Sequence, residues 1–323
     1  RYWRDWSSDV CSSDLASQTA AGIYATSEWE EELLNTRGVC CAHRQTGATF
    51  SITTMGEDSS GWAKRSAVRL ADLDPSDLAR QAVSKTTLSR APEELPPGAY
   101  TVILEPAAVL DFVGQMFADF SGTAVEDQRS FLCQRVGEQL FGSGIHISDD
   151  VFHPLQCGAP FDGEGVARRR LTLVEGGVPK QLAYSRAAAQ RAGTAFTGHG
   201  FALPNEAGEC PVNIVVAGGN VSLEEMIRDT RRGILVTRLW YIREVDPYEK
   251  IMTGMTRDGT FLIEDGQVAC GVRNFRFNQG LIELLNHVEA LSAPVRASGE
   301  ECFDMVVPAM KVNHFHFTEV TRF

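Results

Sequence analysis

The stretch 158–185 constrains the fold most, because it combines turn and strand signals within a few residues. Residues 171–174 and 178–182 are short β-prone runs on either side of Gly176 and Gly177. Two such runs around a Gly-Gly pair predict an antiparallel hairpin. Pro179 cannot donate a ladder hydrogen bond, so it predicts an edge position for the second strand.

An acidic turn, residues 161–165, precedes this hairpin and contains Asp162 and Glu164. Two carboxylates so close together are candidates for a general acid–base pair or for cation ligands. Glycines on either side allow positive φ, and carboxylates in such turns commonly accept local backbone N–H groups. The setting therefore favours a structural role for both residues over a chemical one.

A second hairpin is predicted around Asp265 and Gly266, a strong turn dipeptide between the runs 259–264 and 267–268. Residues 234–242 form a long β-prone run that is typical of a central strand, and residues 305–323 alternate in a strand-like way. The C-terminal half is therefore expected to be rich in β-structure.

Helix signals are fewer. Asp74 before Pro75 is a helix N-cap signal, and Ser222 with Glu225 forms a capping box whose helix is expected to end at Gly233. A weaker helix is expected over 132–141. Two further helices are predicted from apolar stripes, one following Pro106 with Val109, Phe112, Val113, Met116 and Phe117, and a last one with Leu281, Leu284, Leu285, Val288 and Leu291.

The domain organisation follows from residues 91–98, where three prolines disfavour both helix and sheet and predict a linker. We expect an α+β protein, with a partial N-terminal α/β segment at 16–97 and a larger β-rich domain with a few helices at 98–323. Residues 39–54 are expected to form two strands joined by a turn at 45–47. Residues 1–15 resemble a translated sequencing-adapter tail, so they are predicted to be non-native and the chain to be truncated at its N-terminus.

Composition narrows the class of protein. The net charge of −12 argues against nucleic-acid binding, and the absence of a run of about 18 apolar residues argues against a membrane span. Eight scattered cysteines without a C-x-x-C pair are typical of reduced thiols in the cytoplasm. A cytoplasmic globular protein is expected.

A series of short motifs resembles the TldD/PmbA family of metallopeptidases over residues 16–323. It comprises F-D-G-E-G-V at 161–166, L-V-E-G-G-V at 173–178, T-G-H-G at 197–200, S-L-E-E-M-I at 222–227, R-G-I-L-V at 232–236 and F-L-I-E-D-G-Q-V at 261–268. The order of the series carries the resemblance. In this family TldD is the zinc subunit, and PmbA, also called TldE, is its partner.

Zinc peptidases place two histidines and a glutamate on one helical face, as H-E-x-x-H or, in TldD, as H-E-x-x-x-H. Neither pattern occurs here. The family resemblance would place that motif on the helix after strand 100–104, which reads Leu110 to Gln115 and contains no histidine. The family's C-terminal cysteine ligand is replaced near Ala297. Cys302 lies slightly later and, without histidine partners, is not assigned as a ligand.

The resemblance thus implies a PmbA/TldE-like subunit that carries no zinc of its own. It implies a dimer with a TldD-like chain bearing H-E-x-x-x-H, or with a second copy, and zinc is expected on a partner subunit. The substrate would be a peptide. No metal ligand and no confident catalytic residue is assigned on this chain.

Some polar residues are candidates for lining a substrate cavity. Thr197 and His199 lie in a polar Gly-His-Gly loop, for which a plain β connection is the competing interpretation. Asn205, Arg257 and Asp258 are candidates for a polar rim.

Three functions stay open at this point. The resemblance favours a component of a TldD/TldE-type cytosolic peptidase that shapes the substrate cavity. The alternative is a homo-oligomeric peptide-binding or scaffold protein without proteolytic activity. A metallopeptidase with unrecognised ligands is the third. Whether the chain is itself an enzyme is not decided by these residues.

Overall fold

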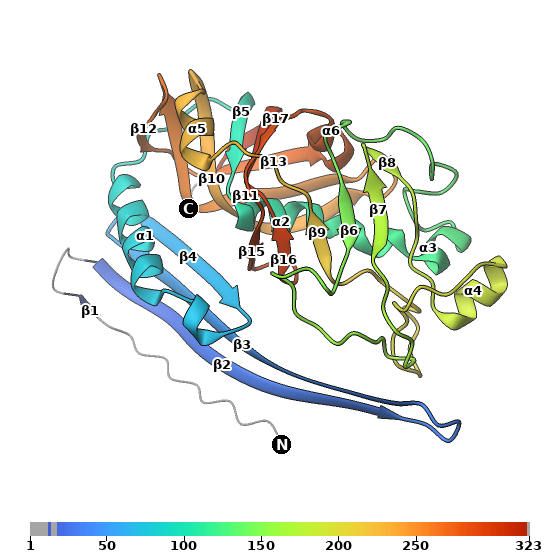
Figure 1. Ribbon diagram of the computed structural model, residues 1–323. Coiled ribbons are helices and arrows are strands. Elements are labelled where there is room, and N and C mark those ends of the chain that lie inside the picture. Colours follow the sequence, from blue (N-terminus) through green and yellow to red (C-terminus); the bar gives the residue numbers. More distant parts are fainter. Residues whose placement is uncertain (1–11, 14–17, 322–323) are drawn as a thin grey trace.

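The computed structural model describes residues 12–13 and 18–321 (Figure 1). Most of segment 1–15, predicted to be non-native, therefore lies outside the described residues. The chain forms three sheets and a small number of short helices, with the first sheet on one side of the other two (Figure 1).

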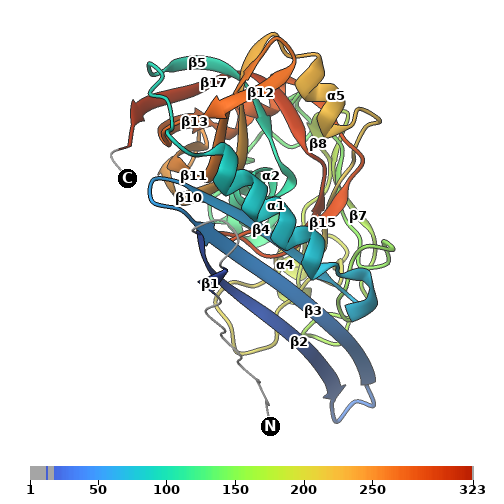
Figure 2. The same cartoon turned by 90° about the vertical axis from the view of Figure 1, so that its left-hand side faces the viewer.

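The first sheet is antiparallel and runs in chain order, β1-β2-β3-β4. Helix α1 packs on β3 and β4 (Figure 2), with Leu78 and Ala82 buried beneath it. Asp74 caps α1 by accepting the backbone N–H of Asp77, as predicted. The elements are β1 Ser12–Ser13, β2 Gln18–Leu34, β3 Cys40–Met55, β4 Ser60–Ala67, the 3-10 helix η1 Leu70–Asp72, and α1 Pro75–Leu88.

The hairpin of β2 and β3 is long, and the predicted turn at 45–47 is wrong. These residues lie inside β3 and pair with residues 27–29 of β2. The chain reverses instead after Asn35, whose Oδ1 atom accepts the N–H groups of Arg37 and Val39, and Gly38 takes the positive φ of 85°. A side-chain acceptor and a left-handed glycine together stabilise this turn, whereas Gln-Thr-Gly fits an extended strand.

The second sheet closes on itself. The pairing order β10-β5-β17-β13-β11 is completed by pairing of β11 with β10, while β12 extends from β11 and β14 from β17. β10 has partners on both sides, as expected of a central strand. The bounds are β5 Gly98–Leu104, β10 Arg232–Asp246, β11 Ile251–Glu264, β12 Gln267–Gly271, β13 Phe275–Gly280, β14 Val288–Leu291 and β17 Met310–Val320.

The third sheet has the order β15-β16-β9-β6-β7-β8. The predicted hairpin around Gly176 and Gly177 joins β7 to β8, and Pro179 lies in the edge strand β8, as expected. The hairpin around Asp265 and Gly266 is likewise confirmed between β11 and β12. The bounds are β6 Ile147–Asp149, β7 Leu171–Glu175, β8 Val178–Pro179, β9 Ile214–Val216, β15 Val295–Ala297 and β16 Met305–Val307.

Several helices are shorter than their sequence signals predicted. Residues 132–141 form turns, with positive φ at Gln134 and Gly137, so the predicted helix there is wrong. The capping box of Ser222 is present, but its helix ends at Arg228, because Gly233 already belongs to β10. The bounds are α2 Pro106–Val113, the 3-10 helix η2 Gly114–Phe120, α3 Gly122–Glu126, α4 Arg186–Ala192, α5 Leu223–Arg228 and α6 Leu281–Asn286.

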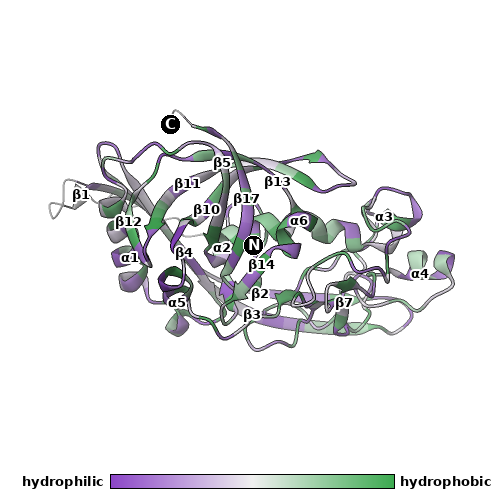
Figure 3. Ribbon diagram, turned by 90° about the horizontal axis from the view of Figure 1, so that it is seen from above, coloured by the Kyte–Doolittle hydropathy of each residue, from purple (hydrophilic) through white to green (hydrophobic). Residues whose placement is uncertain are grey.

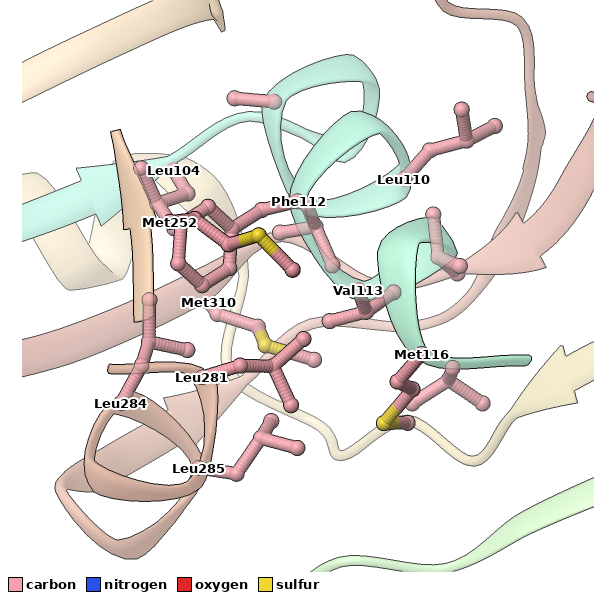
Figure 4. Packing of buried hydrophobic residues seen from close by; sticks show 14 of the residues in the cluster. Leu104, Leu110, Phe112, Val113, Met116, Met252, Leu281, Leu284, Leu285 and Met310 are labelled. Atoms are coloured by element: carbon pink, nitrogen blue, oxygen red, sulfur yellow. The ribbon is translucent and has the colours of Figure 1, made fainter. Parts of the chain in front are cut away.

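Helix α2 lies in the centre of the main hydrophobic core. Phe112 packs against aromatic rings of β13 and β17. Figure 4 shows Phe112, Val113 and Met116 among the buried side chains of this core. The stripe predicted after Pro106 is buried throughout, although the helix tightens into η2 after Val113. Figure 3 shows hydrophobic colouring along α2. The last predicted helix ends at Asn286, and residues 288–291 form β14 instead.

The α+β class, with a β-rich C-terminal part and few helices, is confirmed. The predicted domain boundaries stay a prediction. Among the described residues, the helices are too short or too polar to cross a lipid bilayer.

Candidate functional site

An open groove of about 810 Å³ lies where the first sheet meets the closed ring of strands. We call it the arginine groove. Its lining comes from the ends of β3 and β4, from β10 and β11, and from β13 and the chain just before it. The residues that matter below are Arg238, Trp240, Tyr241, Arg257, Asp258 and Arg276.

The backbone of this groove is irregular. The pairing of β10 with β11 shifts register between Val236 and Arg238 and again between Trp240 and Arg243. Tyr241 and Asp258 adopt positive φ angles of 56° and 51°. A bulky side chain rarely takes this conformation, and β-bulges commonly re-aim side chains at functional sites. The register shifts and the positive φ angles therefore make the groove a candidate functional site.

The floor of the groove is a buried ion pair. Arg238 Nε donates to Asp258 Oδ2 over 3.0 Å, and Ser60 Oγ donates to the other carboxylate oxygen over 2.7 Å. The Arg238 guanidinium also lies 4.9 Å from the ring centre of Trp62 and 5.4 Å from that of Trp240. These contacts satisfy both partners and hold them in one geometry.

Two further arginines of the groove are less constrained. The side chains of Arg257 and Arg276 are each 45% exposed, and the carboxylate oxygens paired with them lie 3.5 Å and 3.8 Å away. Charge-assisted bonds are normally about 2.7–2.9 Å long, so these pairs are loose. Arg257 lies 4.7 Å from the ring centre of Trp240, which orients its guanidinium. Both cations are therefore placed to bind an anionic ligand.

The helix position at which the family resemblance would place zinc is buried and already occupied by protein contacts. We call Asp111, Gln115 and Cys302 the α2 cluster. The Asp111 Oδ1 atom accepts the backbone N–H groups of Glu300, Glu301 and Cys302 over 2.9–3.2 Å. Gln115 Nε2 donates to Cys302 Sγ over 3.1 Å.

Burial raises the pKa values of Asp111 and Cys302 in the α2 cluster. It raises the pKa of Asp111 to about 6, although the backbone N–H donors pull that pKa down. Burial, together with the charges of Asp111 and Glu301, raises the pKa of the Cys302 thiol to about 12. Zinc binds the thiolate form of cysteine, so an ion at Cys302 would have to displace this proton. Within the described part of the chain, no group of three or more His, Cys, Asp or Glu side chains is arranged to hold a metal ion.

The half-buried Thr197 and the buried His199 form a relay-like arrangement with the buried Asp149, a residue that the sequence did not connect with them. His199 Nδ1 lies 2.9 Å from Thr197 Oγ1, and His199 Nε2 lies 3.1 Å from Asp149 Oδ1. Asp149 Oδ2 accepts the N–H groups of Val212 and Asn213 over 2.6 Å and 2.8 Å. Burial works to raise the pKa of Asp149, but His199 and the Asn213 N–H outweigh it and the pKa lies below its usual value.

This relay resembles a hydroxyl–imidazole–carboxylate arrangement, but its imidazole and carboxylate are enclosed, with 0% and 1% of their side chains exposed. Thr197 Oγ1 is also used locally, because it accepts the N–H of Tyr184 over 2.8 Å. The arrangement fastens loops of the third-sheet region to one another. Neither Thr197 nor His199 belongs to the lining of the arginine groove.

The two carboxylates of the acidic turn accept backbone N–H groups. Asp162 Oδ1 accepts the N–H of Glu164 and of Val166, and Oδ2 accepts that of Gly200 over 2.8 Å. Glu164 accepts the N–H of Arg186 over 2.8 Å. Both carboxylates thus satisfy backbone donors of neighbouring loops.

The remaining candidates divide between two places. Arg257 and Asp258 lie in the arginine groove, whereas Asn205 closes its own loop by accepting the N–H of Gly208 over 2.6 Å. Sequence reasoning missed Arg238 and Arg276, and it assigned Trp240 and Tyr241 to a β-prone run. Tyr241 is 53% exposed. The signal that could have found the groove is the cluster of arginines and aromatic residues on adjacent β-prone runs.

Comparison with known proteins places this geometry in context. Residues 97–319 match the PmbA/TldA metallopeptidase C-terminal domain, and residues 7–90 match the PmbA/TldA metallopeptidase central domain. Over 282 residues the chain is 22% identical to the metalloprotease PmbA of Escherichia coli O157:H7, covering 85% of this chain and 60% of that protein. A metalloprotease of Methanothermobacter thermautotrophicus is 23% identical over 295 residues, or 84% of this chain and 62% of that protein.

A solved structure has the same fold. TldE from Thermococcus kodakarensis superposes with a TM-score of 0.84 at 24% identity, covering 94% of this chain and 70% of that one. The chain spans about 60% of the length of the two metalloproteases named above.

Proposed function

The chain belongs to the PmbA/TldD metallopeptidase family, and from this premise we propose that it is the subunit without zinc ligands in a cytoplasmic peptidase of two unlike subunits. Its partner would be a TldD-like chain that carries H-E-x-x-x-H and supplies the zinc ion. This chain would complete the substrate cavity and bind part of the peptide.

The observation that carries the proposal is the state of the α2 cluster. Zinc peptidases use neutral imidazoles and ionised carboxylates or thiolates as ligands. Here the Asp111 carboxylate accepts backbone N–H donors, Cys302 is a half-buried thiol with a raised pKa, and Gln115 donates to its sulfur. These residues do not fit a zinc ion, so the hydrolytic step is assigned to the partner.

The arginine groove supports the second half of the proposal. It is open, has a buried ion pair as its floor and carries loosely paired cations beside the half-buried Trp240 and the exposed Tyr241. Binding sites usually combine such an apolar wall with a few oriented polar groups. A peptide held there by this chain could be presented to a zinc site on the other subunit.

The test is reconstitution from purified chains. This chain and a genomically neighbouring H-E-x-x-x-H chain are purified separately and together, and zinc content, complex mass and hydrolysis of an unstructured peptide are measured. We expect cleavage only by the pair, sensitivity to a chelator, and zinc only on the partner. A partner variant with both motif histidines changed to alanine is the matched control and should assemble without cleaving.

Two results would contradict the proposal. The first is chelator-sensitive cleavage by this chain without any companion, with about one equivalent of zinc bound. The second is a stable homo-oligomer that neither assembles nor cleaves with any such partner, which would favour a non-proteolytic peptide-binding or scaffold protein.

A further inference from the structure

The arginine groove has a charge opposite to that of the chain. The whole sequence carries a net charge of −12, whereas the groove is lined by three arginines and one aspartate. Clefts lined by one sign of charge focus the electrostatic potential and concentrate ligands of the opposite sign. The groove is therefore a local site of attraction for anions on a protein that otherwise repels them.

Asp258 is used by Arg238, so the positive charges of Arg257 and Arg276 are available to a ligand. Asp258 receives both Arg238 and Ser60, so its 3.5 Å contact with Arg257 is the weakest of its contacts. The partner of Arg276 is Glu319, whose side chain is 70% exposed and lies 3.8 Å away. Solvent-exposed pairs of this kind are easily replaced by a better placed carboxylate.

The spacing of the two cations indicates what they bind. Arg276 on β13 pairs with Met255 on β11, and Arg257 lies two residues along β11 from Met255. Arg257 and Arg276 are therefore diagonal neighbours on adjacent strands, about 7 Å apart at their Cβ atoms. Alternate residues of an extended peptide are also about 7 Å apart and point to the same side.

The walls of the groove suit a peptide better than a small anion. Met55 and Tyr241 are 41% and 53% exposed, and both line the groove together with Trp240. Stacking on Trp240 also restricts Arg257 before any ligand arrives, which reduces the entropy cost of binding.

We propose that the arginine groove binds extended acidic peptide segments in which two carboxylates are separated by one residue, with one carboxylate on Arg257 and the other on Arg276. This proposal rests on the proposed function, since it names the class of peptide that the subunit accepts. An apolar side chain next to the acidic pair would lie against Trp240.

The experiment measures binding to the full chain without any partner. Fluorescein-labelled decapeptides that differ only at two positions, Glu-x-Glu, Gln-x-Gln and Lys-x-Lys, are titrated by fluorescence anisotropy at two salt concentrations. We expect the Glu-x-Glu peptide to bind about tenfold more tightly than the Gln-x-Gln peptide. Its affinity should fall with added salt, and the Lys-x-Lys peptide should bind weakest.

Variants of the chain locate the site. Arg257→Gln and Arg276→Gln should each weaken Glu-x-Glu binding about threefold to fivefold, and the double variant should remove the preference over Gln-x-Gln. Arg129→Gln is the matched control, because Arg129 is 61% exposed and lies outside the groove. Circular dichroism checks that each variant is folded.

The proposal is overturned if the Glu-x-Glu and Gln-x-Gln peptides bind equally, or if the double variant binds the acidic peptide as the unmodified chain does. It is also overturned if a single-stranded oligonucleotide binds as tightly and is lost in the same variants, since the groove would then be a general polyanion site. Failure to cleave with a zinc-bearing partner would contradict the proposed function but leave this binding preference intact.

Discussion

The α2 cluster and the arginine groove both contain side chains capable of chemistry, but they differ in how far those side chains are satisfied. Asp111 is fully buried and accepts three backbone N–H groups, whereas Arg257 is half exposed and has only a long contact to a carboxylate. Buried polar groups with all their partners stabilise a fold, while exposed and loosely paired groups are available to ligands.

The two regions are joined by Glu301. Its backbone N–H donates to Asp111, and its carboxylate accepts the backbone N–H of Tyr241 over 2.7 Å. The segment 300–302 therefore packs on α2 with one side and supports the strained bulge of the groove with the other. One loop thus satisfies a buried carboxylate on its inner side and stabilises the irregular backbone of the groove on its outer side.

The largest expected effect tests the buried side of this comparison through pH. Because burial raises the folded-state pKa of Asp111 to about 6, the fold favours the protonated acid. The protonated Asp111 side chain therefore stabilises the fold fully below about pH 4, and this stabilisation is lost as the pH rises through about 6. The free energy of unfolding falls by roughly 3 kcal/mol over this range. Urea unfolding of Asp111→Asn between pH 4 and 8 should lack this loss.

The control for that measurement is Asp229→Asn, a side chain that is 68% exposed. It should keep the pH dependence of the unmodified chain. An identical pH profile for Asp111→Asn and the unmodified chain would mean that Asp111 does not titrate in this range and that the cluster is less buried than described.

A smaller effect tests the packing within the α2 cluster. A Cβ atom added at Gly114 would lie 2.5 Å from Cys302 Sγ and 2.7 Å from its Cβ, so Gly114→Ala forces the cluster apart. Overpacking of this kind costs about 1–3 kcal/mol in the free energy of unfolding. Gly144→Ala is the matched control, because no atom lies within 4 Å of its added Cβ. Equal unfolding free energies for the two variants would argue against close packing here.

The smallest expected effect tests the strain in the groove. Tyr241 has a φ of 56°, and asparagine accepts this region more readily than tyrosine. Tyr241→Asn should therefore be about 1 kcal/mol less destabilising than Tyr248→Asn, where the tyrosine is similarly exposed at 57% and its φ is ordinary. Thermal unfolding measures both. Equal losses at the two positions would show that the bulge stores no strain.

Local sequence signals predicted a good part of the fold. The Gly176-Gly177 and Asp265-Gly266 hairpins and the cap at Asp74 all appear where they were expected. Each depends on neighbours within a few residues, through a positive φ or a short hydrogen bond. The Gln45-Thr46-Gly47 turn failed because its residues also fit a strand, and the long partner β2 decides between the two.

The candidate site was only partly predictable. Arg257 and Asp258 were named as a polar rim and do line the groove, but Arg238 and Arg276 were not connected with them. The register of β10, β11 and β13, with two bulges, brings these arginines together. The residue pattern within one strand does not indicate which residues of other strands lie beside it.

The sequence by itself determined the family, the α+β class, the two glycine hairpins and the absence of histidine from the segment Leu110 to Gln115. Only the tertiary structure decided that Cys302 lies against Gln115 and that the arginines converge on one groove. The physical reason is the distance along the chain between the residues that interact. Turns and caps are satisfied by neighbours in the chain, whereas burial, charge pairing and backbone strain depend on residues that packing brings together from distant strands.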